Sequence, residues 1–226
     1  MERVPIELES FHHVYNRGTE KRDIFLSNAD RKLFLKYLYL LNDREVESPS
    51  RLIKSQGEEA EKDIDHKPLV AVMAYCLMPN HFHLLLHEIY EGGISKFMQR
   101  LGTAYTMYFN EKYGRSGALF QGVFKSKLIT DEEYLLKIID YIHLNPCEMK
   151  NFLPRESVLQ TYQYSSAKAY DNKFVKNKIL NPEVLKDYTK IPNNYFKWLI
   201  EQGDFSEVAT MLIGEKEKKP KYPYSG

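Results

Sequence analysis

Residues 69–88 read LVAVMAYCLMPNHFHLLLHE, and this stretch decides the fold. The apolar run over residues 69–77 predicts a buried strand, and Pro79-Asn80 predicts a turn. The run over residues 81–88 predicts a second extended segment. The two strands and their short connection therefore predict a β-hairpin.

On either side of this hairpin, apolar residues are spaced as in a strand in some segments and as in a helix in others. The predicted elements, in chain order, are strand 11–18, helix 29–41 with Asn28 as its cap, strands 69–77 and 81–88, helix 94–112, strand 123–129 and helix 132–145, stopped by Pro146. Strand, helix, strand, strand, helix, strand is the split βαβ order of ferredoxin-like domains. We therefore expect an α+β fold with a ferredoxin-like βαββαβ core, an antiparallel sheet and one extra helix.

Two segments lie outside this predicted core. Residues 42–67 hold eight acidic residues and little apolar periodicity, which predicts a solvated insertion or mobile loop. Residues 151–226 show short helical patterns separated by prolines, which predicts a helical appendage. The chain thus divides into a core domain over residues 1–150 and a C-terminal helical extension over residues 151–226.

The composition excludes some classes of protein. The 226 residues include 32 Lys+Arg and 31 Asp+Glu, and a net charge of +1 excludes a uniformly basic nucleic-acid coat. A hydrophobic content of 43% excludes a disordered chain. Residues 95–128 nevertheless carry six basic residues and one acidic residue, interleaved with aromatic side chains. This mixture is typical of surfaces that bind single-stranded nucleic acid, although helical spacing assigns several of the aromatics to the core.

Histidines recur in the second strand of the hairpin. Side chains alternate between the faces of a strand, so His81, His83 and His87 share one face. Two imidazoles at this spacing can hold one transition metal, and the pair by itself indicates zinc or manganese. A zinc hydrolase that uses all three histidines is one hypothesis, and partly exposed strand histidines without a ligand are the alternative.

The helix predicted before Pro146 carries a tyrosine and an amide on one flank. Tyr141 and Asn145 are four residues apart, so their side chains are neighbours beside the apolar stripe. A tyrosine hydroxyl beside an amide oxygen combines a nucleophile with a ligand for a hard metal ion. The alternative is an aromatic at the edge of the core and an asparagine that ends the helix.

Several spaced motifs resemble one known family, the single-tyrosine HUH transposases, and in particular its branch of REP-associated tyrosine transposases. The strings that carry the resemblance are YNRG (15–18), MPNHFHLLL (78–86), YFNEKYGRSGALFQGVFK (108–125) and DYIHLNP (140–146), with a weaker match in YQYSSAKAY (162–170). They occur in the family's order over about residues 8–170. The resemblance implies that residues 1–150 form the HUH catalytic domain on a ferredoxin-like sheet.

The resemblance also implies a reaction and its residues. His81, His83 and Asn145 would hold Mg²⁺ or Mn²⁺, with Asn145 standing where other members carry glutamine. Tyr141 would attack a phosphate of single-stranded DNA at a hairpin, formed by a repetitive palindrome or an element end. The product would be a 5′-phosphotyrosine link and a free 3′ hydroxyl, which later rejoins a strand.

DNA contacts and cellular context follow as further expectations. The residues expected to contact DNA are Asn16, Arg17, Arg115, Lys125 and Lys127. The two distant cysteines and the absence of an apolar leader favour a cytoplasmic protein that does not enter a membrane. Monomer and homodimer both stay open. The alternative function is a non-catalytic hairpin-binding protein on a ferredoxin-like fold.

Overall fold

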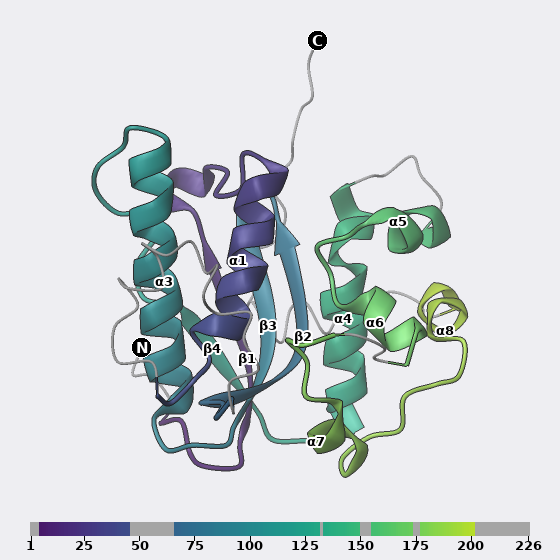
Figure 1. Ribbon diagram of the computed structural model, residues 1–226. Helices are drawn as coiled ribbons and strands as arrows, with labels where there is room; N and C mark the ends of the chain where they lie inside the picture. Colours follow the sequence, from purple (N-terminus) through teal and green to yellow (C-terminus); the bar gives the residue numbers. More distant parts are fainter. Residues whose placement is uncertain (1–4, 46–65, 132, 150–154, 174–176, 202–226) are drawn as a thin grey trace.

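The computed structural model describes residues 5–45, 66–131, 133–149, 155–173 and 177–201. Within these residues the chain forms a central sheet with helices on both faces (Figure 1). One face carries helices α1 and α3, and the other carries α4 and the helices that follow it. Both faces of the sheet are therefore shielded from water, which explains why β2 and β3 are buried along almost their whole length.

Four antiparallel strands form the sheet. They are β1 (Phe11–Arg17), β2 (Val70–Met78), β3 (His81–Glu88) and β4 (Lys125–Ile129). Their spatial order is β2-β3-β1-β4, and every neighbouring pair is antiparallel. This order, with a helix between β1 and β2 and another between β3 and β4, is the predicted ferredoxin-like core. The fourth strand begins later than predicted, and Val123 lies in the preceding loop with 75% of its surface exposed.

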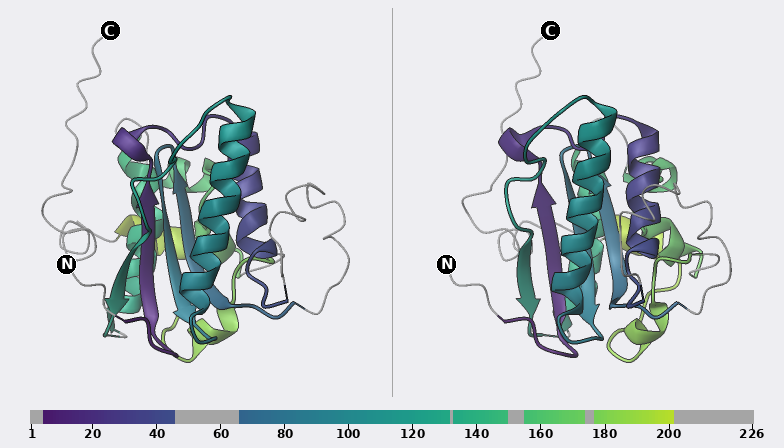
Figure 2. Two further views of the ribbon diagram at one scale, coloured as in Figure 1. Left: turned by 90° about the vertical axis from the view of Figure 1, so that its left-hand side faces the viewer. Right: turned by 60° about the vertical axis from the view of Figure 1, so that its left-hand side comes forward.

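The first face is covered by α1 (Asn28–Leu40) and α3 (Gly93–Lys112), which lie side by side in Figure 2. Their apolar stripes meet over the sheet, where the ring of Phe34 lies 5.1 Å from Phe82 and 4.9 Å from Tyr105. The cap of α1 is Ser27 rather than the predicted Asn28. Ser27 and Asp30 have the spacing of a capping box, in which each side chain accepts a hydrogen bond from the other's backbone N–H.

The second face is covered by α4 (Glu133–Met149). Its predicted apolar stripe is confirmed, because the four residues of that stripe are fully buried: Leu135, Ile138, Ile139 and Ile142. The predicted stop at Pro146 is wrong, since the helix runs through this proline. A proline inside a helix removes one N–H donor and disturbs the carbonyls of the preceding turn. The Asn145 side chain donates a hydrogen bond to the Tyr141 carbonyl (2.8 Å), and this bond stabilises the turn at that point.

The remaining helices are short. They are η1 (Thr19–Lys21), α5 (Arg155–Thr161), α6 (Ala167–Asp171), α7 (Pro182–Lys186) and α8 (Tyr195–Glu201). Helices α5 to α8 lie beside α4 in Figure 1. Apolar residues of this part of the chain, among them Tyr170, Tyr195 and Leu199, belong to the same hydrophobic core as the sheet. The part of the extension that the structure describes is therefore packed onto the core domain.

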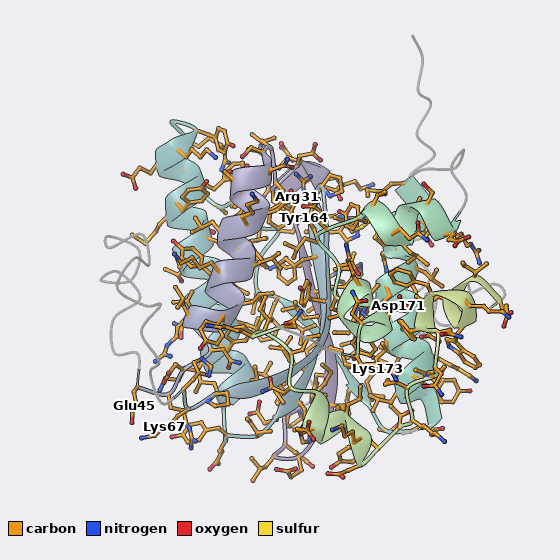
Figure 3. The ribbon with its side chains drawn as sticks, turned by 45° about the vertical axis from the view of Figure 1, so that its right-hand side comes forward. Arg31, Glu45, Lys67, Tyr164, Asp171 and Lys173 are labelled. Carbon is orange, nitrogen blue, oxygen red and sulfur yellow. The ribbon has the colours of Figure 1, made fainter. Side chains whose placement is uncertain are left out.

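The C-terminal part also covers the edge of the sheet. An edge strand exposes unpaired backbone groups, and β2 is an edge strand here. The Leu77 N–H donates to the Tyr164 carbonyl and the Ser166 N–H donates to the Tyr75 carbonyl, each at 2.9 Å. Arg31 of α1 lies with its guanidinium 5.2 Å from the centre of the Tyr164 ring, as Figure 3 shows. The YQYSSAKAY string thus contains the segment that closes this edge.

Residues 46–65 of the predicted insertion lie outside the described residues. The described residues on either side of this segment lie close together, because Lys67 forms an ion pair with Glu45 (2.5 Å), both labelled in Figure 3. Asn42, which the predicted insertion includes, is buried, and its side chain hydrogen-bonds the backbone of residues 69 and 70. None of the helices in the described ranges is both long enough and apolar enough to cross a membrane.

Candidate functional site

The candidate site lies on the face of the sheet that α4 covers. Residues that pair directly across antiparallel strands share a face, and Arg17 pairs with His81 and Tyr15 with His83. The rings of His81 and His83 lie 5.0 Å apart, centre to centre, and nearly perpendicular. The predicted arrangement of the two histidines on one face is therefore present.

Each of these histidines uses its Nδ1 atom within the protein. Nδ1 of His81 lies 2.6 Å from Oδ1 of Asn80, and Nδ1 of His83 lies 2.8 Å from Nε2 of His13. Among the described residues, no hydrogen bond occupies Nε2 of either ring. Each ring therefore offers one nitrogen for a ligand while its other nitrogen fixes the ring orientation.

Burial keeps these imidazoles neutral. It lowers the pKa of His83 to about 3, and the nearby Arg17 charge adds to the effect. Burial, followed by the neighbouring His83, also lowers the pKa of both His13 and His81 well below the usual value. A histidine must be deprotonated to bind a metal ion, so His81 and His83 are in the right state near neutral pH.

Tyr141 lies directly against His83 and His13. Its ring meets His83 edge to face at 5.7 Å and His13 at 6.2 Å, measured between ring centres. Only 5% of its surface is exposed. Burial raises the pKa of Tyr141, and the negative charge of Glu148 raises it further, so its hydroxyl is protonated at neutral pH. The helix and the sheet of the same chain thus bring the predicted nucleophile beside the predicted ligand His83.

Asn145 completes the set of predicted ligands on α4. Its side chain is buried one helical turn after Tyr141, and its Nδ2 atom is held by the Tyr141 carbonyl. This bond leaves Oδ1 as an acceptor. Two neutral imidazole nitrogens and an amide oxygen are a donor set that suits Mn²⁺ and, less strongly, Mg²⁺. The residues present therefore fit the divalent ion that the sequence analysis expected.

The three-histidine zinc site is not supported. Within the described residues, no group of three or more His, Cys, Asp or Glu side chains is placed to hold a metal ion. His87 shares the face, but its ring stacks on Phe11 at 4.3 Å and its Nε2 lies 3.5 Å from Glu9. The zinc-hydrolase hypothesis requires His87 beside His81 and His83, and the sheet places it further along the strand.

The predicted DNA-contacting residues divide into two groups. Lys125 pairs with Tyr15 and Lys127 with His13, so both share the histidine face, as does Arg17. Both lysines are exposed, and the Lys125 ammonium lies 5.5 Å from the centre of the Tyr15 ring. These three cations lie on the same face of the sheet as the histidines and suit a phosphate backbone.

Asn16 and Arg115 are not part of that surface. Asn16 points to the opposite face of β1, is buried, and donates to the Gly122 carbonyl at 3.0 Å. Arg115 follows the end of α3 and donates to Oδ1 of Asn110 at 2.6 Å and to the carbonyl of Ala118 at 3.4 Å. Their hydrogen bonds shape the loop between α3 and β4.

His13 is the site residue that the sequence analysis missed. Strand alternation places His13 and Tyr15 on one face of β1, and this signal is visible in FHHVYNR. Its contact with His83 depends on the pairing register of β1 and β3, which the sequence does not state. Tyr15, opposite His83, was missed for the same reason.

A chain of buried hydrogen bonds lies behind the tyrosine helix. The Tyr195 hydroxyl donates to Oδ1 of Asp140 (2.6 Å) and lies 2.8 Å from Nδ1 of His143. Nε2 of His143 lies 2.6 Å from the Ser166 hydroxyl, and Trp198 donates to Oδ2 of Asp140 at 2.8 Å. Because the Tyr195 proton points to Asp140, His143 donates from Nδ1 and accepts at Nε2. This chain ties α4 to α8 and to the residue that precedes α6.

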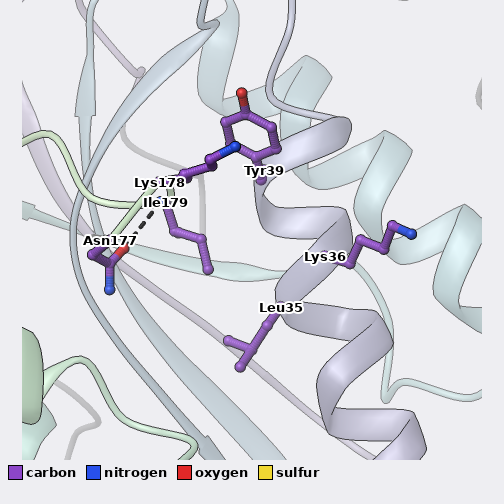
Figure 4. A pocket seen from close by; sticks show the side chains of 6 residues that line it. All are labelled: Leu35, Lys36, Tyr39, Asn177, Lys178 and Ile179. Carbon is purple, nitrogen blue, oxygen red and sulfur yellow. Dashed lines mark hydrogen bonds between the residues drawn. The ribbon is translucent and has the colours of Figure 1, made fainter. Parts of the chain in front are cut away.

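A separate shallow pocket lies between α1 and the segment that precedes α7. It is lined by residues of α1 and of the segment before α7, shown in Figure 4: Leu35, Lys36, Tyr39, Asn177, Lys178 and Ile179. Asn177 accepts a hydrogen bond from the Ile179 N–H there. No residue of the candidate site lines this pocket.

Comparison with known proteins finds a matching family model. Residues 44–145 match the family described as "Transposase IS200 like", a range that contains His81, His83, Tyr141 and Asn145. A solved structure of a REP-associated tyrosine transposase bound to a REP hairpin superposes with a TM-score of 0.48 and 12% identity. That alignment covers 81% of this chain and 92% of the other. No curated protein matches the chain.

Proposed function

Residues 44–145 match the family of IS200-like transposases, and from this match we propose that the protein nicks and rejoins single-stranded DNA at hairpins. The nucleophile is Tyr141, and the product is a 5′-phosphotyrosine link. The observation that carries the proposal is the contact of the Tyr141 ring with His83, a residue whose Nε2 atom is available for a ligand.

His81, His83 and Asn145 are the residues that would hold Mg²⁺ or Mn²⁺. When bound, such an ion withdraws charge from phosphate oxygens and aligns the scissile bond. Hydrogen bonds within the protein orient each of these three side chains. Asn80 and His13 hold the two imidazoles, and the Tyr141 carbonyl holds the amide of Asn145.

In the reaction, the Tyr141 oxygen forms a bond to the phosphorus while the bond from phosphorus to the 3′ oxygen breaks. The phenolic proton ends on that 3′ oxygen, so the products are a phosphotyrosine diester and a free 3′ hydroxyl. One diester replaces another, so the step is reversible and a 3′ hydroxyl can later rejoin the strand. Burial raises the pKa of the Tyr141 phenol, so the unbound protein presents a protonated hydroxyl at neutral pH.

Substrate binding is assigned to the cations around the histidines. Arg17, Lys125 and Lys127 lie on the histidine face, where they can contact the phosphates on either side of the scissile bond. Tyr141 contacts His83 of its own chain, which supports attack within one subunit. The sequence motifs indicate the branch of REP-associated enzymes. The expected target is therefore a single strand of DNA folded into a palindromic hairpin.

The test is formation of a covalent adduct. We expect purified protein, incubated with single-stranded hairpin oligonucleotides and Mn²⁺, to give a protein–DNA band on a denaturing gel. The adduct disappears in Tyr141→Phe and after chelation of the metal. Tyr134→Phe is the matched control, because Tyr134 is on the same helix and exposed. An adduct that persists in Tyr141→Phe overturns the proposal.

A second candidate, a non-catalytic hairpin-binding protein, is favoured by one observation. Tyr141 is almost completely buried, so a phosphate reaches its hydroxyl only if α4 or the histidine face shifts on DNA binding. This candidate predicts hairpin affinity that a chelator does not change, with no strand scission in the adduct assay. That combination of results selects the binder over the transposase.

A further inference from the structure

A direct hydrogen bond joins the candidate ligand His83 to a third histidine. Nε2 of His13 lies 2.8 Å from Nδ1 of His83, and the two rings are nearly parallel, at 8°, with their centres 5.0 Å apart. Both side chains are buried. The contact joins neighbouring strands, because His13 of β1 lies diagonally across from His83 of β3.

The chemistry of imidazole assigns a direction to this bond when a metal ion is bound. A neutral imidazole has one N–H and one bare nitrogen, and only the bare nitrogen binds a metal. His83 already uses Nδ1 toward His13, so Nε2 is its ligand atom. The proton of His83 must then sit on Nδ1, where it donates to a bare Nε2 of His13.

We propose that His13 is a positioning residue of the metal site, which accepts the Nδ1–H bond of His83 and so directs Nε2 of His83 toward the ion. This inference rests on the proposed function, since it presumes that His83 binds a metal. His81 has a comparable partner in Asn80, but that partner is its neighbour in sequence. The partner of His83 is 70 residues away in sequence and depends on the sheet.

The hydrogen bonding of His13 supports a role beyond filling space. Its Nε2 bonds only to His83, and its Nδ1 is buried without a partner among the described residues. A buried polar atom without a partner destabilises a fold by about 1–3 kcal/mol. An apolar side chain of similar size would avoid this penalty, so stability alone does not account for an imidazole here. The imidazole of His13 is accounted for if His83 binds a metal ion, because His83 then needs an acceptor for its Nδ1–H.

The test compares Mn²⁺ affinity in the absence of DNA, measured by isothermal titration calorimetry. His13→Phe keeps a planar ring and removes the acceptor, and we expect its affinity to fall about 10- to 100-fold. His13→Gln places an amide oxygen near the position of Nε2, and we expect it to restore most of the affinity. His12→Phe is the control, because His12 is buried on the opposite face of β1 and bonds Ser126 instead.

A second measurement reads the proton directly. In Mg²⁺-loaded wild type, ¹⁵N spectra of labelled histidines should place the His83 proton on Nδ1. A proton on Nε2 overturns the inference, even if His13→Phe does not fold. Equal Mn²⁺ affinity in wild type and folded His13→Phe overturns it too and leaves the proposed function intact. Wild type that binds no Mn²⁺ instead refutes the metal site of the proposed function, and the inference with it.

Discussion

Replacing Tyr195 with phenylalanine removes one hydroxyl from the middle of the buried chain behind the tyrosine helix. In the wild type this hydroxyl donates to Asp140 and accepts from His143. The variant keeps the aromatic ring and its packing against Tyr170, whose ring centre lies 5.2 Å away. The change therefore tests the hydrogen bonds separately from the packing.

The size of the effect follows from the two bonds that are lost. A hydrogen bond to an ionised group contributes about 1.5–3 kcal/mol, and a buried donor without a partner costs about 1–3 kcal/mol. The buried N–H of His143 loses its acceptor completely in the variant. Since such values are not additive, we expect a loss of about 3 kcal/mol in the free energy of unfolding at pH 8. For a chain of this size, that loss lowers the Tm by about 6–12 °C.

The loss should depend on pH, because Asp140 titrates in the accessible range. Burial raises the pKa of Asp140 to about 6, against the hydrogen bonds from Tyr195 and Trp198. At pH 8 the carboxylate is ionised and its bond from Tyr195 is charge-assisted. At pH 5 it is protonated and the bond is weaker, so Tyr195→Phe should lose about 1 kcal/mol less there.

Urea unfolding at pH 5 and pH 8 measures both quantities. Tyr188→Phe is the matched control, because its ring packs on Phe11 and the described residues provide no hydrogen bond for its hydroxyl. We expect this control to change stability by less than about 0.5 kcal/mol at either pH. If Tyr195→Phe behaves like the control, or loses the same amount at both pH values, the directed hydrogen-bond chain is refuted.

Three further variants test other parts of the molecule. Burial tends to raise the pKa of Asp30, but hydrogen bonds from Lys112 and two tyrosines outweigh it and lower the pKa to about 2. Asp30→Asn should therefore destabilise by about 2 kcal/mol above pH 4, and the difference should shrink as pH falls toward 2, in urea unfolding. In Gly18→Ala the added Cβ would lie 2.3 Å from the Arg22 carbonyl oxygen, so thermal unfolding should show a loss of about 1–3 kcal/mol. Lys127→Ala should weaken hairpin binding and reduce the slope of log affinity against log salt by about 0.7–0.9, measured by fluorescence anisotropy.

Matched variants control the tests at Gly18 and Lys127. Gly102→Ala lies in α3, where an added Cβ meets no atom within 4 Å, so it should not destabilise the fold. Lys96→Ala removes an exposed charge from α3, on the face away from the histidines, and should leave the salt slope unchanged. A stability difference for Asp30→Asn that stays constant from pH 7 to pH 2 would contradict the lowered pKa of Asp30.

The order of the elements and the histidine pair follow from local features of the sequence. Strand alternation by itself places His81 and His83 on one face, and helical spacing by itself makes Tyr141 and Asn145 neighbours. The apolar stripe of α4 is equally local, which is why its burial was predictable. Where local features compete, prediction was less successful. Pro146 stands inside α4 rather than at its end, and the Asn145 side chain supplies a hydrogen bond to the Tyr141 carbonyl in the turn before it.

Contacts between distant segments were decided by the tertiary structure alone. Three contacts depend on strand register and helix packing: the bond between His13 and His83, the contact of Tyr141 with His83, and the hydrogen bond from Tyr195 to Asp140. A shift of one residue in the register of β1 would turn His13 to the other face, and no local pattern excludes that shift. The sequence by itself thus determined which groups can react, and the tertiary structure decided which partners hold them in place.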